Sequence, residues 1–446
     1  MSALNAILAC PRCNNPLSDL RCGACQLDYP LIDDVPWLFA DPEATRTDWR
    51  NRWQLALREL EASARAAGLA LENSGSSATI RRLTTLQRGY QQQIPALQPL
   101  LKSLSLGQPA DLTTDLALKT RLPPQAGLFS YEANVFRDWC WGDEENQMSL
   151  DACLDAIGDK SLKRMLVLGS GAGRLAYDLH ESLNPELTVA LDMNPYLAAI
   201  TRQLSSGATV DLVEFPRAPV DGASVAIRRR LLAPHPSADG FHMVLADALR
   251  PPFQPGAFDL VVTPWLIDVV DVSPAEFIAR LNPLIARGGM WLNHGSLAFA
   301  HPDPADCPDI EELKLLSEAQ GFTQFNSWEE RAPYLASPVS RHARQESIVT
   351  LSAIKSREAG ELPKYQALPD WLAKGRQPVP LLPAFQTQAM TTRIHAFIMT
   401  LIDGKRTLKD IALVLEEQQL MTQADAEVAI RGFLIKMFEE AVQRGR

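Results

Sequence analysis

The sequence lacks several features that mark membrane, secreted and nucleic-acid-binding proteins. No apolar run reaches the ~18 residues that a transmembrane helix needs. The first residues, MSALNAILACPRC, contain no basic leader before a secretory apolar segment. Positive charge is scarce, since 43 lysines and arginines stand against 53 aspartates and glutamates, with a formal net charge of −10. This balance disfavours a large nucleic-acid surface, and we expect a cytoplasmic protein without a membrane segment.

The composition that remains is that of a folded chain with several domains. Hydrophobic residues make up 46% and charged residues 22% of the 446 residues, which is typical of globular proteins. Short apolar runs alternate with helical periodicity at 151–356, which predicts an α/β domain with a doubly wound, mostly parallel sheet. We expect a helical cap at 46–150, a proline-rich linker at 357–384 and a C-terminal helical domain at 385–446.

Four of the seven cysteines form two C-x-x-C pairs near the N-terminus. Cys10 with Cys13, and Cys22 with Cys25, place four thiolates on two tight turns, which matches tetrahedral structural zinc. Because the segment is short, the metal has to stabilise it, and structural zinc contributes on the order of 10 kcal/mol. We predict a zinc ribbon within 1–45, completed by a short sheet from LDYPLIDDVPWLF. A pair of redox dithiols is the alternative.

The segment KRMLVLGSGAGRLAYDLH predicts an apolar strand, a glycine turn and a helix. Gly169, Gly171 and Gly173 would let a ligand approach the backbone, with the helix N-terminus facing its polar groups. A dinucleotide-binding fingerprint requires its third glycine at the position that Arg174 occupies here. The spacing therefore disfavours a dehydrogenase and favours S-adenosylmethionine as the cofactor.

Acidic residues stand at the ends of the next three predicted strands. Asp192 ends LTVALDMNP, where a carboxylate accepts hydrogen bonds from both ribose hydroxyls; the alternative is a helix N-cap. Asp247 ends FHMVLADAL and is predicted to lie near the adenine amino group with Ala248 alongside; the alternative is a solvated loop acid. Asp268, after the fourth strand, is expected at the same edge of the sheet.

Two further observations concern the methyl acceptor. The fourth predicted strand, FDLVVTPWLIDVVD, lacks the N/D-P-P-Y/F sequence of many nucleobase amino-methyltransferases, which disfavours adenine N6 chemistry. The fifth predicted strand, GGMWLNHGSLAFAH, contains His294 and His301. Both histidines are candidate contacts with a substrate, and a purely structural role is the alternative for each.

Several blocks in a fixed order carry a family resemblance. They are NVFRDWCWGDEENQ, the glycine turn, the segments of strands three to five, and the insertion VDLVEFPRAPVDGASVAIRRRLLAPHPSADG. Over about 128–355 the chain resembles the carnosine N-methyltransferase family of class I S-adenosylmethionine-dependent enzymes. The resemblance implies a Rossmann-like methyltransferase sheet and a cofactor contact by Arg137, with Asn134 in place of the family's usual glutamine. Arg137 would pair with the methionine carboxylate while Trp139 and Trp141 shield the sulfonium; the alternative is that both tryptophans only pack.

The resemblance also implies an acceptor site. The family's substrate-binding aspartate corresponds to Asp268, which would accept an imidazole N–H and leave the other ring nitrogen aimed at the methyl group. The family histidine after the fifth strand falls near Ala300, with His301 displaced by one. Where the family has tyrosines, the chain reads SRHARQESIVTL, with His342 and Arg344 but no phenol. The implied reaction is N-methylation of an imidazole-type nitrogen in a small molecule or peptide, with carnosine itself disfavoured.

The flanking domains leave other functions open. The ribbon resembles zinc-ribbon modules found beside methyltransferases and in the activator subunit of tRNA methyltransferases, which implies docking of a partner or substrate. The segment IMTLIDGKRTLKDIALVLEEQ within 385–446 resembles a PqqD-like winged helix that binds leader peptides; an ordinary capping or dimerisation domain is the alternative. An RNA- or ribosome-associated methyltransferase would need more positive charge than IRRRLL supplies. A non-catalytic scaffold is the third function considered.

Overall fold

The computed structural model describes residues 2–105, 127–301, 303–359, 369–373 and 376–444. The chain divides into two compact units, Met1–Pro369 and Asp370–Arg446, which are described separately. Among the described residues, no helix has the length and apolar character needed to span a membrane.

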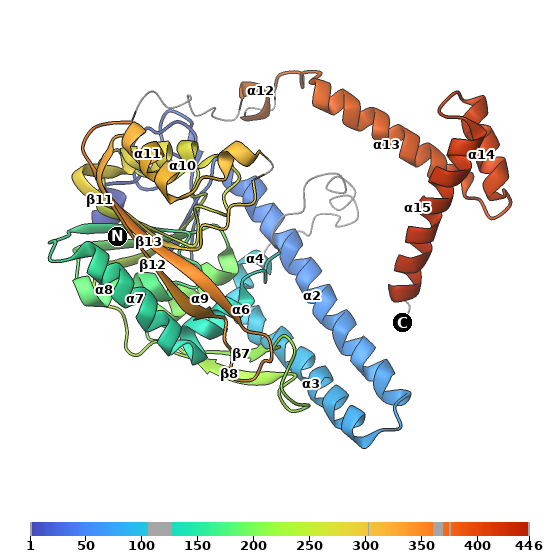
Figure 1. The fold of residues 1–446 in the computed structure, drawn as a ribbon, viewed down its shortest axis with the longest axis horizontal. Coiled ribbons are helices and arrows are strands. Elements are labelled where there is room, and N and C mark those ends of the chain that lie inside the picture. Colours follow the sequence, from blue (N-terminus) through green and yellow to red (C-terminus); the bar gives the residue numbers. More distant parts are fainter. Residues whose placement is uncertain (1, 106–126, 302, 360–368, 374–375, 445–446) are drawn as a thin grey trace. The chain divides into compact units, whose positions relative to one another are not determined.

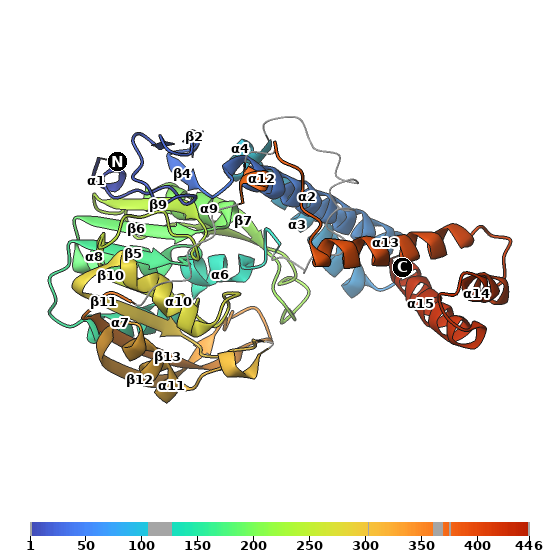
Figure 2. The same ribbon diagram turned by 90° about the horizontal axis from the view of Figure 1, so that it is seen from above.

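The described residues of the first unit form a nine-stranded sheet in the order β12-β13-β11-β10-β5-β6-β9-β4-β3 (Figures 1 and 2). The central neighbours pair in parallel, from β11 through β10, β5 and β6 to β9, and β13 runs antiparallel to both β11 and β12. The predicted α/β architecture with a large parallel sheet is therefore confirmed. The strands are β3 (Leu31–Ile32), β4 (Val35–Leu38), β5 (Arg164–Leu168), β6 (Leu187–Asp192), β9 (Phe241–Ala246), β10 (Phe258–Pro264), β11 (Ile285–Gly295), β12 (Phe322–Tyr334) and β13 (Arg344–Lys355).

The central strands of the sheet are buried on both faces, and this explains their nearly continuous apolar sequence. Side chains alternate along a strand, so Met165 and Val167 of β5 enter one hydrophobic core while Leu166 and Leu168 enter the other. Helices α7 (Asp143–Ile157), α8 (Arg174–Leu183) and α9 (Pro195–Ser205) pack into the first core. Helices α10 (Pro274–Leu281) and α11 (Ile310–Ala319) pack into the second core. The short 3-10 turn η2 (Asn282–Leu284) follows α10, and the turn η3 (Pro304–Asp306) precedes α11.

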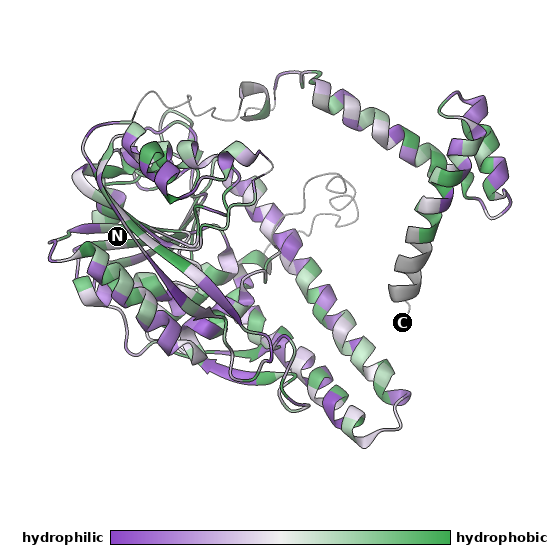
Figure 3. Cartoon of the chain, in the orientation of Figure 1, coloured by the Kyte–Doolittle hydropathy of each residue, from purple (hydrophilic) through white to green (hydrophobic). Residues whose placement is uncertain are grey.

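A helical hairpin lies between β4 and β5 in the chain. Helix α2 (Pro42–Glu72) begins at Asp41, whose side chain accepts from the Ala44 amide at 3.0 Å, and it packs against α3 (Ser77–Leu100). Trp49 and Trp53 anchor its first turns in the core. Hydrophilic and hydrophobic residues lie side by side along the hairpin (Figure 3). The remaining short elements of this region are α4 (Lys102–Ser105), α6 (Glu132–Phe136) and the π-helix η1 (Arg137–Trp141).

The N-terminal cysteine segment begins with α1 (Ser2–Asn5) and forms a two-stranded sheet of its own from β1 (Arg21–Cys22) and β2 (Leu27–Asp28). Strands β3 and β4, which follow in the chain, belong to the main sheet. Strand β4 pairs with β3 but also runs parallel to β9. The physical reason is that all four residues of β4 are buried, and such a strand is stable only where both of its faces are covered.

The inserted segment between β6 and β9 forms an antiparallel pair, β7 (Val210–Glu214) and β8 (Ile227–Leu231). The proline-rich linker predicted at 357–384 lies partly outside the described residues. After α12 (Asp370–Ala373), the second unit consists of α13 (Pro383–Leu401), α14 (Leu408–Glu417) and α15 (Gln423–Arg444), with a small core that includes Leu401, Ile411 and Ile430. Its described residues contain helices only, so the winged-helix interpretation remains a prediction.

Candidate functional site

The glycine turn between β5 and α8 combines tight packing with one open position. A Cβ at Gly173 would lie 2.3 Å from Thr201 Cγ2, and one at Gly169 would lie 2.9 Å from Leu266 Cδ1. A Cβ at Gly171 would meet no atom within 4 Å, although its φ of 59° still disfavours other residues. Ser170 Oγ is buried without a hydrogen-bond partner beside it. An open glycine next to an unpaired buried hydroxyl is what a ligand-binding turn requires.

Asp192 is bonded directly to this turn. Its Oδ2 accepts the Gly171 amide at 2.9 Å, and its Oδ1 accepts the Asn194 amide at 2.8 Å. Each carboxylate oxygen has a second lone pair, so both can still accept from a diol. The N-cap of α9 is Asn194, whose side chain accepts the Tyr196 amide at 3.0 Å, so the helix does not need Asp192 as its cap. Burial raises the pKa of Asp192 to about 6.

Asp247 and Ala248 lie at the end of the neighbouring strand. Asp192 of β6 pairs with Leu245 of β9, two residues before Asp247, so the two carboxylates share one edge of the sheet. Asp247 Oδ1 accepts the Leu249 amide at 2.8 Å, and Oδ2 lies 3.8 Å from Arg250 Nε. These bonds orient the carboxylate within a tight turn.

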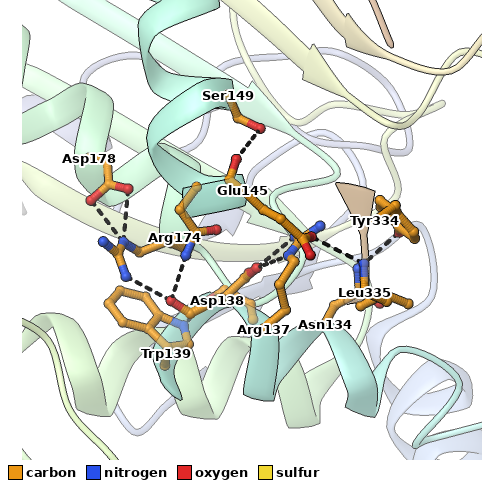
Figure 4. A network of polar contacts seen from close by, with 12 residues as sticks. Asn134, Arg137, Asp138, Trp139, Glu145, Ser149, Arg174, Asp178, Tyr334 and Leu335 are labelled. Carbon is orange, nitrogen blue, oxygen red and sulfur yellow. Dashed lines mark hydrogen bonds and ion pairs between the residues drawn. The ribbon is translucent and has the colours of Figure 1, made fainter. Parts of the chain in front are cut away.

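The F-R-D-W block forms a π-helix that is attached to the glycine turn (Figure 4). Trp139 Nε1 donates to the Ala172 carbonyl at 2.8 Å, and Arg174 Nη1 donates to the Asp138 carbonyl at 2.8 Å. Arg174 is itself held by both oxygens of Asp178, at 2.8 and 2.9 Å from Nε. Single π-helical turns occur mostly at functional sites, and this one ties the cap to the start of α8.

The two tryptophans have structural partners. Trp139 is 4% exposed and packs edge-on against Tyr177 at 5.6 Å. Trp141 Nε1 donates to Glu214 Oε1 at 3.2 Å, which joins the cap to the β7–β8 hairpin. These contacts favour the packing interpretation for both residues over a direct role in shielding a sulfonium.

Trp139 contacts the glycine turn, whereas the Arg137 side chain points toward the end of β12. Its Nε donates to Asp138 Oδ1 at 2.7 Å, and its guanidinium carbon lies 5.5 Å from the centre of the Tyr334 ring. Asn134 Nδ2, one turn earlier, donates to Tyr334 Oη at 3.1 Å (Figure 4). Glu145 accepts the amides of the next two residues, Leu335 at 3.1 Å and Ala336. The cap thus holds the β12–β13 connection in place.

Tyr334 corrects the prediction that this region has no phenol. It lies directly opposite Arg344 in the β12–β13 register, and the Arg344 guanidinium carbon is 4.5 Å from its ring centre. The centre of the Trp265 ring lies 4.6 Å from the centre of the Tyr334 ring. Trp265 follows β10 with a φ of 49°, an unusual conformation for a bulky residue that is often found at functional sites.

Asp268 and Tyr131 complete this second cluster. Asp268 Oδ2 accepts from Ser296 Oγ at 2.6 Å and from the Ala298 amide at 3.2 Å. Burial raises the pKa of Tyr131, and the nearby Asp192 and then Tyr334 and Asp268 raise this pKa further. The charges of both carboxylates, the one at the glycine turn and the one after β10, therefore reach Tyr131. Sequence reasoning missed it, and its position just before the F-R-D-W block was the only available signal.

The two predicted histidines occupy different environments. His294 is fully buried at the end of β11, with Nδ1 2.9 Å from Thr350 Oγ1 and no partner for Nε2. Burial, together with the charge of Arg137, lowers its pKa to about 4, so the ring is neutral at pH 7. His301 Nδ1 lies 3.3 Å from Asp306 Oδ2 and accepts the Asp303 amide at 3.1 Å. The contacts described for His301 are within its own loop, and the structure does not bring it to the other candidates.

The four cysteines of the N-terminal segment converge on one point. Their Sγ atoms all lie within 4.8 Å of one another, with pairs at 3.5 and 3.9 Å. Tetrahedral zinc with Zn–S bonds of about 2.3 Å separates its sulfurs by about 3.8 Å. Further donors surround them: the Arg12 and Cys25 amides and Tyr29 Oη lie 3.0 to 3.4 Å from sulfur atoms. Such donors favour thiolates, so the residues fit a closed zinc site.

No protein-family model and no curated protein sequence matches the chain. Solved structures resemble parts of it. Phosphoethanolamine N-methyltransferase 2 of Haemonchus contortus, bound to phosphomonomethylethanolamine and S-adenosylhomocysteine, is 12% identical with a TM-score of 0.35, and the match covers 53% of this chain and 61% of that chain. Human N-acetylserotonin methyltransferase bound to S-adenosylmethionine is 12% identical, with 62% and 70% covered and a TM-score of 0.32.

A third structure, the YcgJ protein of Bacillus subtilis, is 11% identical, with 47% of this chain and 99% of that chain covered and a TM-score of 0.33. The matches therefore include proteins solved with S-adenosylmethionine or its product. Identities and TM-scores this low support no conclusion about activity or substrate, which have to be argued from the site itself.

Proposed function

We propose that the chain is an S-adenosylmethionine-dependent N-methyltransferase that acts on an imidazole-type nitrogen of a small molecule or peptide. The observation that carries the proposal is the Gly171–Asp192 pair. A carboxylate with free lone pairs is bonded to an open glycine turn at the end of adjacent parallel strands. Ligands of doubly wound sheets bind at this edge.

The chain offers a partner for each part of the cofactor. Asp192 would accept hydrogen bonds from the ribose hydroxyls, and Asp247 and Ala248 would hold the adenine. Asp138 engages Nε and Nη2 of Arg137, and the guanidinium has five donor hydrogens, so Arg137 can also bind the methionine carboxylate. The unpaired Ser170 Oγ lies in the same turn. When bound, the cofactor supplies an electrophilic methyl group.

The acceptor lies between the cap and the ends of β10 and β12 in this proposal. The contacts described for Asp268 are on Oδ2, which leaves Oδ1 to accept the N–H of an imidazole. The other ring nitrogen would then present its lone pair for methylation, with the carbon–sulfur bond of the cofactor broken and S-adenosylhomocysteine as the leaving group, and Asp268 would hold the N–H proton of the resulting imidazolium. Trp265 and Tyr334 supply aromatic surfaces that exclude water, so that alignment and desolvation provide most of the acceleration.

We also propose that Cys10, Cys13, Cys22 and Cys25 bind structural zinc. The RNA-directed alternative gains no support from the β7–β8 hairpin. Two of the IRRRLL arginines, Arg228 and Arg230, lie 3.5 Å from Asp211 oxygens, and the third is paired with Glu214 at 2.7 Å. A protein partner for the cysteine segment or for the C-terminal unit remains a prediction.

Calorimetric titration of S-adenosylhomocysteine into the zinc-loaded protein tests the proposal. Asp192→Ala should weaken binding about 10- to 100-fold, because it removes hydrogen bonds to a charged acceptor. Asp259→Ala is a matched control: its Oδ2 also accepts two amides at 2.9 Å, those of Lys163 and Arg164, but at the opposite end of the strands. The control should lose stability and keep its affinity. A folded wild-type protein that binds no S-adenosylhomocysteine would favour the scaffold function.

A further inference from the structure

The residues just before the first cysteine are bonded to the turn that follows Asp247. The Ala9 amide donates to the Pro252 carbonyl at 2.8 Å, and the Gln254 amide donates to the Ile7 carbonyl at 2.8 Å. The Gln254 side chain adds a bond from Nε2 to the Ala6 carbonyl at 3.0 Å. The segment ending at Cys10 therefore runs as a short antiparallel partner of 252–254.

The residues after the last cysteine support the same region from its other flank. In β4, Trp37 pairs with Leu245 and Leu38 with Ala246, and Asp247 is the next residue of the chain. Figure 2 shows β4 beside β9 at this end of the sheet. Cys10 and Cys22 belong to the same hydrophobic core as Phe253 of the turn and Leu191 of β6. The residues before the first cysteine thus contact the turn after Asp247, and the residues after the last cysteine contact the strand before it.

The cysteine segment has very short strands and many turns of unfavourable conformation. Strands β1, β2 and β3 are two residues long each, and strands this short are not stable alone. Twelve residues other than glycine have a positive φ in the described chain, and half of them lie within the first 34 residues. These six are Asn14, Asp19, Leu20, Gln26, Asp33 and Asp34. This concentration of unfavourable turns is maintained only if an additional interaction offsets it. Metal binding by four thiolates is such an interaction.

We propose that the cysteine cluster is a positioning element of the cofactor site. Bound metal holds 7–10 and β4, these segments hold the 247–254 turn, and the turn sets the position of Asp247. The opposite side of the turn is held by α10, where Arg280 Nη1 donates to the Leu249 carbonyl at 3.0 Å. Without metal the turn would lose the support of 7–10 and β4 and would keep that of α10. The inference rests on the proposed function for the identity of the ligand, but the coupling between metal and turn does not.

Amide hydrogen exchange of the full-length protein, with zinc bound and after chelation, tests the coupling directly. Exchange should accelerate at 7–10, β4 and 247–254, while β10 and β11 stay protected. Unchanged exchange at 247–254 after complete zinc loss overturns the inference, whether or not the protein binds the cofactor.

Calorimetry with S-adenosylhomocysteine gives the second readout. Chelation should weaken binding at least about fivefold, the low end of typical coupling between sites, and added zinc should restore it. Equal affinity with and without zinc overturns the inference while leaving the proposed function intact. Absence of binding by the zinc-loaded wild type contradicts only the proposed function.

Two variants separate positioning from general stability. Gln254→Ala removes side-chain bonds to the carbonyls of Ala6 and Leu8 but no metal ligand. It should bind a full equivalent of zinc and still show faster exchange at 247–254 and weaker S-adenosylhomocysteine binding. Cys13→Ser should lose zinc and reproduce the chelated state, whereas Cys307→Ser, outside the cluster, should resemble wild type. A Gln254→Ala variant with wild-type exchange and affinity would contradict the proposed route of coupling.

Discussion

The two halves of the candidate site are built in different ways. The cofactor half consists of a strand, a turn and the strand beside it, and its key bond joins residues 21 apart in the chain, Gly171 and Asp192. The acceptor half joins the cap to a strand near the end of the unit, since Asn134 and Tyr334 are 200 residues apart. The first half is a local motif that a sequence can reveal, and the second exists only when distant elements pack.

The largest effect is expected from a substitution that tests the packing of the cofactor half. Gly173→Val would place side-chain atoms against Thr201, where even a Cβ lies 2.3 Å from Cγ2. Overpacking of this kind costs about 1–3 kcal/mol, and the φ of 85° adds strain. We expect a lower melting temperature and no detectable S-adenosylhomocysteine binding. Gly171→Ala is the paired variant: it meets no atom within 4 Å, so it should lose less stability and still bind poorly.

Asp268→Ala separates the two halves by function. The acceptor would lose its hydrogen-bond partner, and misalignment of this kind lowers turnover by about 100-fold. Binding of S-adenosylhomocysteine should change less than about twofold, because the contacts described for Asp268 are with Ser296 and Ala298, away from the glycine turn. Steady-state rates with imidazole acceptors and calorimetry measure the two quantities. A full rate in the variant would remove Asp268 from the mechanism.

The cofactor half should also respond to pH, because the pKa of Asp192 is raised to about 6 by burial. A pKa raised above that of the unfolded chain means that protonation favours the folded state. The contribution of this group to stability therefore increases as pH falls from about 6 toward 4. Ribose binding needs the carboxylate, so affinity should fall about tenfold at one pH unit below the pKa. Calorimetry between pH 8 and pH 5, in steps of about one unit, measures how the affinity for S-adenosylhomocysteine depends on pH. This dependence should be absent in Asp192→Asn.

Tyr334→Phe should have the smallest effect and tests the acceptor half alone. It removes the bond from Asn134 but leaves the ring beside Trp265. Loss of one neutral hydrogen bond costs about 0.5–1.5 kcal/mol. We expect a several-fold rise in the acceptor KM, with cofactor affinity unchanged. Tyr334→Ala is the stronger comparison, since it also removes the aromatic surface, and equal effects of the two variants would show that the ring is unimportant.

Much of the cofactor half could be predicted because its signals are short in sequence. An apolar strand followed by closely spaced glycines and a helical pattern predicts a β-turn-α unit, and an acid at the end of the next parallel strand must reach the same edge. Asp247 followed from the same rule one strand later. These inferences need only the geometry of neighbouring parallel strands, which is the same in every doubly wound sheet.

The points that the sequence left open or missed have a common physical cause. The phenol of Tyr334 was missed because only the β12–β13 register places it opposite Arg344. For the tryptophans of the cap the sequence left shielding of the sulfonium and packing open, and the contacts of Trp139 with α8 and of Trp141 with the inserted hairpin favour packing. The pairing of β4 with β9, which joins the residues after the cysteines to the main sheet, was not foreseen either. Each depends on a contact between distant segments, which local periodicity does not contain.

The sequence by itself therefore determined the α/β class, the glycine turn with its neighbouring acids and the grouping of four cysteines, because each of these depends on spacing within a short stretch. Only the tertiary structure decided that the cap is bonded to the glycine turn, that Tyr334 meets Trp265 and Arg344, and that the cysteine segment is bonded to the turn after Asp247. Those arrangements depend on which buried surfaces meet, and burial of apolar area is non-directional. The choice of partner is made by the packing of the whole unit.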